Sequence, residues 1–191
     1  MRAFLAVPLM PEDGGVVGAL QESLASMPAL EEFRWIPPSN VHLTLRFLGE
    51  IDEDEAERAG GALEAAAGGA EGFELLLERF GVFPHLRSPN VLWAGPVACP
   101  PALEAFVRRL SGGLSRAGLP AADRPFKPHL TIGRRRGRGR PPGGLEGELV
   151  AAEHRWLSPP LRLRMEEAVL FRSELRPGGA IYAPIRRAPL A

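Results

Sequence analysis

Cysteine is nearly absent from this sequence, since Cys99 is the one cysteine among 191 residues. A single thiol cannot close a disulfide within the chain or supply a cysteine-rich zinc site. Acidic and basic residues balance at 23 each, so no overall charge attracts the chain to nucleic acid or membrane. No apolar run approaches 18 residues, and the N-terminus lacks the pattern of a signal peptide. We therefore expect a soluble, cytoplasmic protein without a membrane partner.

Threonine is also scarce, and its positions are informative. The chain holds two threonines, Thr44 and Thr131, and four histidines. Each threonine stands two residues after a histidine, within His42-Leu43-Thr44-Leu45 and His129-Leu130-Thr131-Ile132. A single short motif has a high false-positive rate, but this pair uses every threonine in the chain. His42, Thr44, His129 and Thr131 are therefore the first candidates for a functional site.

The two-residue spacing has a structural meaning. Residues i and i+2 of a strand point to the same face of a sheet. Each histidine therefore shares a face with its threonine, while Leu43, Leu45, Leu130 and Ile132 point into a core. Polar pairs mounted on rigid strands hold a defined geometry better than loops do.

Apolar periodicity and turn residues predict eight strands and four helices. The predicted strands cover residues 2–8, 33–37, 41–48, 73–82, 90–97, 129–134, 161–174 and 181–189, and the predicted helices cover 11–28, 52–67, 103–114 and 145–157. The last two strands form a hairpin with a turn at 176–179, and residues 137–144 form a Gly-, Arg- and Pro-rich loop. Each half of the chain contains one His-x-Thr strand. This order predicts an α+β fold with antiparallel sheets in two pseudo-symmetric lobes, forming one bilobal domain over residues 1–191.

If the two motif strands face each other, two imidazoles and two hydroxyls converge. One histidine can act as a base while the other acts as an acid. The hydroxyls can donate hydrogen bonds to phosphate oxygens. This set suits displacement at a phosphodiester without a metal or cofactor. A zinc site is the weaker alternative, because two histidines lack a third and fourth ligand at suitable spacing.

Other residues carry weaker expectations. Arg46 shares the strand parity of His42 and is a possible substrate contact, whereas Phe47 has the opposite parity and is expected in the core. The cluster Arg134–Arg140 is either a solvated loop or a contact for a phosphate backbone. His85 and His154 are expected at the surface.

At these motifs the sequence resembles the 2H phosphoesterase superfamily, and within it the RNA 2′,3′-cyclic phosphodiesterase family, also called 2′-5′ RNA ligase-like proteins. The resemblance extends nearly from end to end. The blocks that carry it are 2–7, 34–50, 91–95, 124–134, 170–175 and 177–182.

The resemblance implies a bilobal fold around a central V-shaped cleft with the helices outside. It also implies hydrolysis of RNA or nucleoside 2′,3′-cyclic phosphates to 2′-phosphomonoesters. By resemblance His42 is the proton donor and His129 the proton acceptor, while Thr44, Thr131 and Arg134 bind phosphate. The expected substrate is RNA or a nucleotide with a 2′,3′-cyclic phosphate, and the expected state is a monomer.

The position of Arg134 conflicts with the simple strand pattern. Its parity is opposite to that of His129, so it reaches the same face only if the strand ends or bulges near Gly133. Two other functions remain open: 2′-5′ RNA ligation, which is the reverse chemistry, and a non-catalytic nucleotide- or RNA-binding module.

Overall fold

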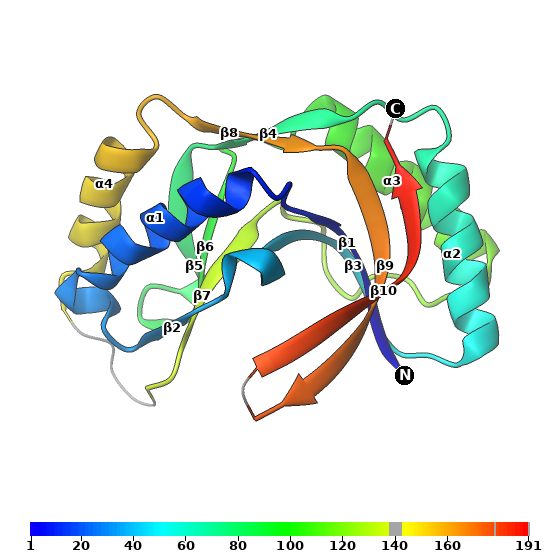
Figure 1. The fold of residues 1–191 in the computed structure, drawn as a ribbon, viewed down its shortest axis with the longest axis horizontal. Coiled ribbons are helices and arrows are strands. Elements are labelled where there is room, and N and C mark those ends of the chain that lie inside the picture. The colour runs from blue at the N-terminus through cyan, green and yellow to red at the C-terminus, as the bar shows by residue number, and fades with distance from the viewer. Residues whose placement is uncertain (138–142, 178, 191) are drawn as a thin grey trace.

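The computed structural model describes residues 1–137, 143–177 and 179–190, and within them ten strands and four α-helices alternate (Figure 1). The strands are β1 (Arg2–Pro8), β2 (Phe33–Trp35), β3 (His42–Glu50), β4 (Phe73–Leu77), β5 (Arg79–His85), β6 (Ser88–Gly95), β7 (Leu130–Arg135), β8 (Leu161–Met165), β9 (Glu167–Arg176) and β10 (Gly179–Pro189). The helices are α1 (Asp13–Ala25), α2 (Glu53–Ala67), α3 (Pro101–Arg116) and α4 (Leu145–Trp156), with short 3-10 turns η1 (Pro28–Leu30) and η2 (Pro38–Asn40). The α+β class and the antiparallel pairing predicted from the sequence are confirmed.

Eight of the strands form one antiparallel sheet, in the order β10-β9-β1-β3-β7-β6-β5, with β2 also paired to β7. The two motif strands, β3 and β7, are neighbours at its centre. They are paired at one position, Leu43 opposite Leu130. The sheet therefore has two halves, β10-β9-β1-β3 and β7-β6-β5 with β2, which meet at this pair. Both leucines are fully buried.

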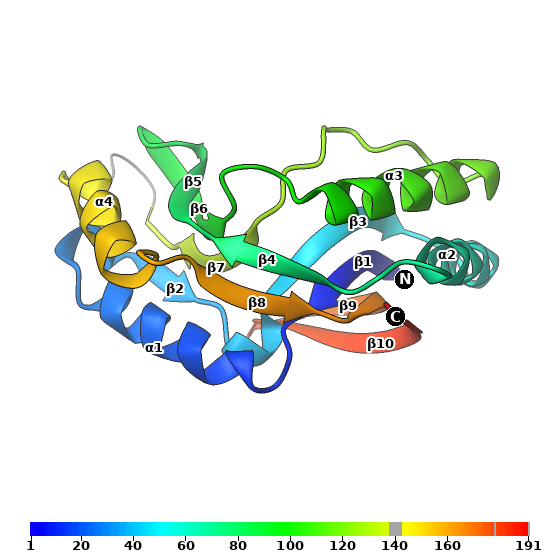
Figure 2. The same cartoon turned by 90° about the horizontal axis from the view of Figure 1, so that it is seen from above.

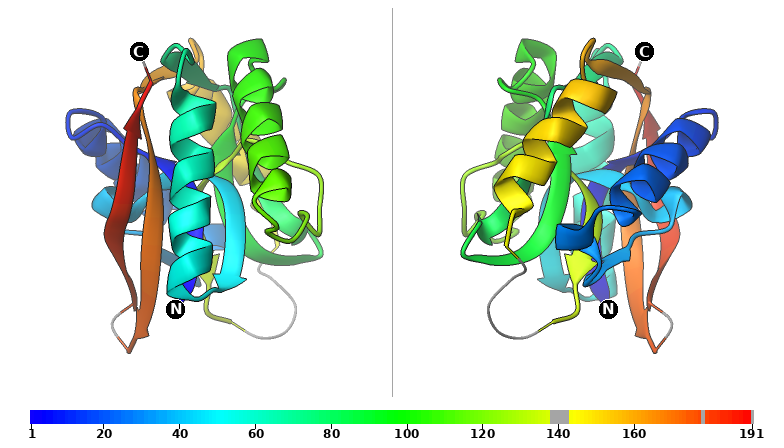
Figure 3. Two further views of the ribbon diagram at one scale, coloured as in Figure 1. Left: turned by 90° about the vertical axis from the view of Figure 1, so that its right-hand side faces the viewer. Right: turned by 90° about the vertical axis from the view of Figure 1, so that its left-hand side faces the viewer.

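The helices are divided between the two halves of the sheet. Helices α2 and α3 lie side by side at the end that holds β9 and β10, and α1 and α4 lie at the opposite end (Figures 1 and 3). Seen from above, the strands run between these two helical ends (Figure 2). Asp52 caps α2 by accepting a hydrogen bond from the Glu55 amide, and Glu55 accepts one from the Asp52 amide. This capping box explains why the acidic run at 52–55 begins a helix.

Two of the predicted strands are each divided in the structure. The predicted strand 73–82 is β4 and β5, and the predicted strand 161–174 is β8 and β9. The breaks fall at Glu78 and Glu166, and the two separated pieces, β4 and β8, pair with each other in a second sheet. At each break two charged residues stand in a row, Glu78-Arg79 and Glu166-Glu167, and interrupt the alternation of apolar and polar residues. The sequence therefore marks the breaks but does not identify the change of sheet.

Two features predicted from the sequence include residues outside those that the structure describes. The predicted turn at 176–179 includes Gly178, and the predicted basic cluster includes Arg138 and Arg140. Among the residues that the structure describes, no helix is long and apolar enough to span a membrane.

Candidate active site at the junction of β3 and β7

The two motifs meet where the halves of the sheet join. His42 and Thr44 flank Leu43 on β3, while His129 and Thr131 flank Leu130 at the start of β7. Because the strands are antiparallel, His42 lies toward Thr131, and Thr44 lies toward His129. All four side chains are half-buried, whereas both leucines are fully buried on the other face. We call the face that carries these four residues the histidine face.

The two imidazoles are held in the same way. The Nδ1 atom of His42 lies 2.7 Å from the Asn40 carbonyl oxygen, and that of His129 lies 2.7 Å from the Lys127 carbonyl oxygen. A carbonyl oxygen only accepts, so Nδ1 of each ring carries a hydrogen and donates it. This fixes the neutral tautomer and leaves Nε2 as the nitrogen that can exchange a proton.

Aromatic rings from each half of the sheet pack against the histidine of that half. His42 contacts Phe4 and Tyr182 at centroid distances of 5.0 and 5.3 Å. His129 contacts Phe83 at 4.9 Å and Trp93 at 6.3 Å. These rings fix the orientation of the imidazoles and exclude water from one side of each.

Arg134 reaches the histidine face because β7 is irregular at Ile132. On β6, Trp93 is opposite Thr131 and Leu92 is opposite Gly133, so Ile132 has no partner in the register. This extra residue reverses the parity of the strand beyond it. Arg134 is therefore opposite Val91, two residues from Trp93 and on the same face as Thr131. The structure therefore contains the bulge near Gly133 that Arg134 needs in order to reach the histidine face.

A buried glutamine holds the bulged segment. The Nε2 atom of Gln21 in α1 donates to the carbonyl oxygens of Ile132 and Ile36, at 2.9 and 2.7 Å. The Ile36 amide also donates to the Ile132 carbonyl at 3.0 Å. Gln21 is 5% exposed and is the one buried polar residue in the described part of the chain. Sequence reasoning missed this residue, since a lone glutamine in a helix gives no signal of such a contact.

Burial and neighbouring charge both act on the two histidines. Burial is the main cause that lowers the pKa of His42 below 6.5, and the positive charges of Arg134 and His129 lower this pKa further. Burial also lowers the pKa of His129, with Arg134 again adding to the effect. In each ring the hydrogen bond to the backbone carbonyl opposes these effects by favouring the protonated form. Arg134 therefore lies within electrostatic reach of both imidazoles.

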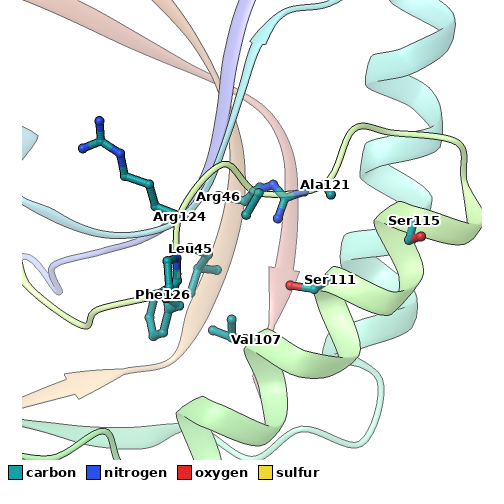
Figure 4. A pocket seen from close by; sticks show the side chains of 10 residues that line it. Leu45, Arg46, Val107, Ser111, Ser115, Ala121, Arg124 and Phe126 are labelled. Atoms are coloured by element: carbon teal, nitrogen blue, oxygen red, sulfur yellow. The ribbon is translucent and has the colours of Figure 1, made fainter.

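The expectation that Arg46 shares a face with His42 is wrong. Leu5 is opposite Arg46 and Ala6 is opposite Thr44, so Leu45 is an extra residue and the parity of β3 changes there. Figure 4 shows Arg46 on the side of β3 that faces α3, where it lines a cavity of about 340 Å³ with Ser111 and Phe126. Its guanidinium donates to the Pro120 carbonyl. Arg46 therefore lies outside the candidate site.

The same irregularity moves Phe47, which the sequence assigned to the core. Phe47 is opposite Phe4, and the two rings are 6.1 Å apart. It is 66% exposed and lies on the histidine face. Phe171 stacks on Phe4 at 5.3 Å, and Tyr182 meets the edge of the same ring at 4.9 Å. An aromatic surface thus extends from His42 across β1, β3, β9 and β10.

The remaining candidates lie elsewhere. His85 and His154 are exposed, as expected from the sequence. No group of three or more histidine, cysteine, aspartate or glutamate side chains in the described ranges has an arrangement that could hold a metal ion.

Fold and site together define a class of protein in which two half-sheets each present one histidine to a shared, positively charged face. Comparison with known proteins identifies the class. Residues 7–93 and 95–182 match the family model described as LigT like Phosphoesterase. An RNA 2′,3′-cyclic phosphodiesterase of Methanothermobacter thermautotrophicus is 35% identical over 184 residues, covering 95% of each chain. One of Thermus thermophilus is 32% identical, covering 98% of this chain and 89% of its own.

Solved structures agree with these sequence relatives. A Thermus thermophilus protein superposes with a TM-score of 0.75 at 30% identity, covering 100% of this chain and 98% of its own. Escherichia coli LigT complexed with 3′-AMP superposes with a TM-score of 0.72 at 28% identity, with the same coverage. The chain belongs to the LigT-like phosphoesterase family. The family resemblance and the enzyme class predicted from the sequence are confirmed.

Proposed function

We propose that this protein hydrolyses RNA ends that carry a 2′,3′-cyclic phosphate to 2′-phosphomonoesters, by acid–base catalysis between His42 and His129 without a metal. The observation that carries the proposal is the matched pair of imidazoles. Each donates Nδ1–H to a backbone carbonyl at 2.7 Å, so that Nε2 is the nitrogen left for proton transfer. The relatives named RNA 2′,3′-cyclic phosphodiesterase support the choice of substrate.

The proposed reaction uses the two rings in opposite protonation states. Neutral His129 accepts a proton from water through Nε2 as the water oxygen attacks phosphorus. The bond from phosphorus to the 3′ oxygen breaks, and protonated His42 donates its Nε2 proton to that oxygen. The products are a 3′-hydroxyl and a 2′-phosphomonoester, and the proton count balances. Thr44, Thr131 and Arg134 hold the non-bridging oxygens and stabilise their developing charge.

The central test is product analysis on an oligonucleotide with a 2′,3′-cyclic end, in excess chelator. We expect a 2′-phosphate product, and loss of turnover in His42→Ala and His129→Ala by about a hundredfold or more for each. His154→Ala is the matched control, because this histidine is exposed on α4 and should retain full activity. A 3′-phosphate product, or loss of activity with chelator, would contradict the proposal.

A second substrate separates the acid from the base. A 2′,3′-cyclic phosphorothiolate with sulfur at the bridging 3′ position has a leaving group that needs little protonation, because thiols are far more acidic than alcohols. This substrate should restore much of the activity of His42→Ala and little of that of His129→Ala. Recovery of activity in His129→Ala instead would mean that His129 is the acid and His42 is the base.

The same assays separate the alternatives. Joining of RNA half-molecules at rates above cyclic phosphate hydrolysis would favour 2′-5′ ligation, and tight nucleotide binding without turnover would favour a binding module.

Because both motifs come from one chain and join through the Leu43–Leu130 pair, we infer that residues 1–191 act as one domain and as a monomer. Size-exclusion chromatography with light scattering tests this state.

A further inference from the structure

A second arginine stands beside Arg134 on the histidine face. Arg34 of β2 is directly opposite Arg134 of β7 in the antiparallel register. Directly opposed residues share a face, and their Cα atoms are roughly 4.5–5.5 Å apart. Both side chains are exposed. The guanidinium of Arg34 extends toward the β9–β10 hairpin, since its Nη2 lies 3.4 Å from the position a Cβ would occupy on Gly179.

The opposed pair Arg34–Arg134 places two guanidinium groups on the face that carries the two histidines. Arg135, next to Arg134 but on the other face, pairs with Glu32 at 2.6 Å with its side chain 3% exposed. Arg34 and Arg134 are therefore the two arginines of this strand pair that face the histidine side.

We propose that Arg34 binds a second phosphate of the substrate, the phosphodiester on the 5′ oxygen of the terminal nucleoside. The proposal rests on the proposed function, since it takes the cyclic phosphate to be held at Arg134 and the histidines. One arginine then faces each of two successive phosphates of an RNA strand. The substrate class is the 3′ end of an RNA strand in preference to a free nucleoside cyclic phosphate.

The direction of the strand follows from the two arginines. Arg134 is close enough to His42, His129 and Tyr182 to affect the pKa of each. Arg34 lies one strand further out, on β2, next to the hairpin residue Gly179. A strand whose cyclic end lies between the histidines would therefore continue over β2. The phosphate held there carries one negative charge, and a guanidinium binds such a group through charge-assisted hydrogen bonds.

The test compares three substrates that differ in the 5′ phosphate. These are uridine 2′,3′-cyclic phosphate, its 5′-methylphosphate diester, and the dinucleotide UpU ending in a cyclic phosphate. In the wild type we expect kcat/KM to rise when the 5′ diester is added. In Arg34→Gln the value for both diesters should fall about tenfold, the effect of losing one charge-assisted contact. The value for uridine 2′,3′-cyclic phosphate should stay within about twofold, which also reports that the variant is folded.

Two further variants complete the design. Arg34→Lys keeps the charge and should retain most of the preference. Arg162→Gln removes the same charge from an exposed position on β8, where the side chain is 68% exposed, and should change nothing. An equal loss on all three substrates in Arg34→Gln, or no loss on any, would overturn the inference.

Failure of the proposed function has a different signature. If the wild type hydrolyses none of the three substrates, the function is wrong whatever Arg34 does. Binding of the inert ligands uridine 3′-phosphate and UpU 3′-phosphate, measured by calorimetry, then still tests the arginine pair. Arg34→Gln should weaken binding of the dinucleotide alone, and equal weakening of both ligands would reject the second phosphate site.

Discussion

At the scale of single residues, the two histidines have matched surroundings although they come from different halves of the chain. Each donates Nδ1–H to the carbonyl two residues before it, and each is partly enclosed by aromatic rings. Each pKa is lowered by burial and by Arg134. A reaction that needs one neutral and one protonated histidine has a bell-shaped pH dependence, whose two limbs belong to the coupled pair.

We predict that the optimum of kcat/KM lies below pH 6.5, because both histidine pKa values are depressed from that value. A positive neighbour disfavours the protonated imidazole, so removing it raises the pKa. Arg134→Gln should therefore move the whole profile to higher pH and also lower its peak. Arg134→Lys keeps the charge and should keep the position of the optimum. Steady-state kinetics on a cyclic nucleotide across the titration range of histidine measures this, and an unmoved profile in Arg134→Gln would be inconsistent with it.

Strand parity located some of these side chains correctly and failed for others. His42, Thr44, His129 and Thr131 precede the irregular positions, so the simple two-residue alternation holds for them. Arg46 and Phe47 follow the extra residue Leu45, and their faces are exchanged relative to the prediction. For β7 the family resemblance supplied the reason to expect a bulge, whereas nothing in the sequence of β3 did so. Parity is therefore informative only up to the first bulge of a strand.

At the scale of elements, helix α1 supports the bulge that brings Arg134 to the histidine face. Gln21 donates to the carbonyl of the bulged residue Ile132 and to that of Ile36, which directly follows β2. We predict that Gln21→Met, which keeps the length of the side chain but removes the donor, lowers the free energy of unfolding by about 1–3 kcal/mol. Urea denaturation followed by circular dichroism measures the change.

A role in positioning gives a second readout for this variant. If Gln21 holds Arg134 in place, the pH profile of Gln21→Met should move toward that of Arg134→Gln. Glu22→Met, at the neighbouring exposed position of the same helix, is the control and should alter neither stability nor profile. A stability loss with an unchanged pH profile would limit Gln21 to a structural role.

Most elements were predictable because their patterns are local. The acidic start of α2 and the apolar stripe of α3 both gave correct helices, within about two residues at the ends. The division of 73–82 and of 161–174 is marked in the sequence only by the consecutive charged residues Glu78-Arg79 and Glu166-Glu167, and the change of sheet depends on pairing between segments far apart in the chain. β4 pairs with β8 in the second sheet, whereas β5 belongs to the large sheet. The alternation of apolar residues within β4 does not identify β8 as its partner.

At the scale of the whole molecule, the candidate site is divided between two halves of the sheet that share one strand pairing. His42 is fixed by rings of β1 and β10, and His129 by rings of β5 and β6. The distance between the two Nε2 atoms therefore depends on how the halves meet. The Leu43–Leu130 pair is fully buried at this junction, and we infer that its packing sets this distance.

We predict that Leu43→Ala reduces catalysis beyond its effect on stability. Truncation of a buried leucine costs about 2–5 kcal/mol of folding free energy. Loss of packing at the junction also lets the halves shift, and a displacement of about 1 Å between reacting groups can cost a hundredfold in rate. Leu163→Ala is the matched control, because Leu163 is equally buried but lies on β8 in the second sheet. Measured below the unfolding transition of both variants, kcat should fall at least about tenfold in Leu43→Ala and little in Leu163→Ala. Equal kcat values in the two variants would mean that the junction does not set the distance between the histidines.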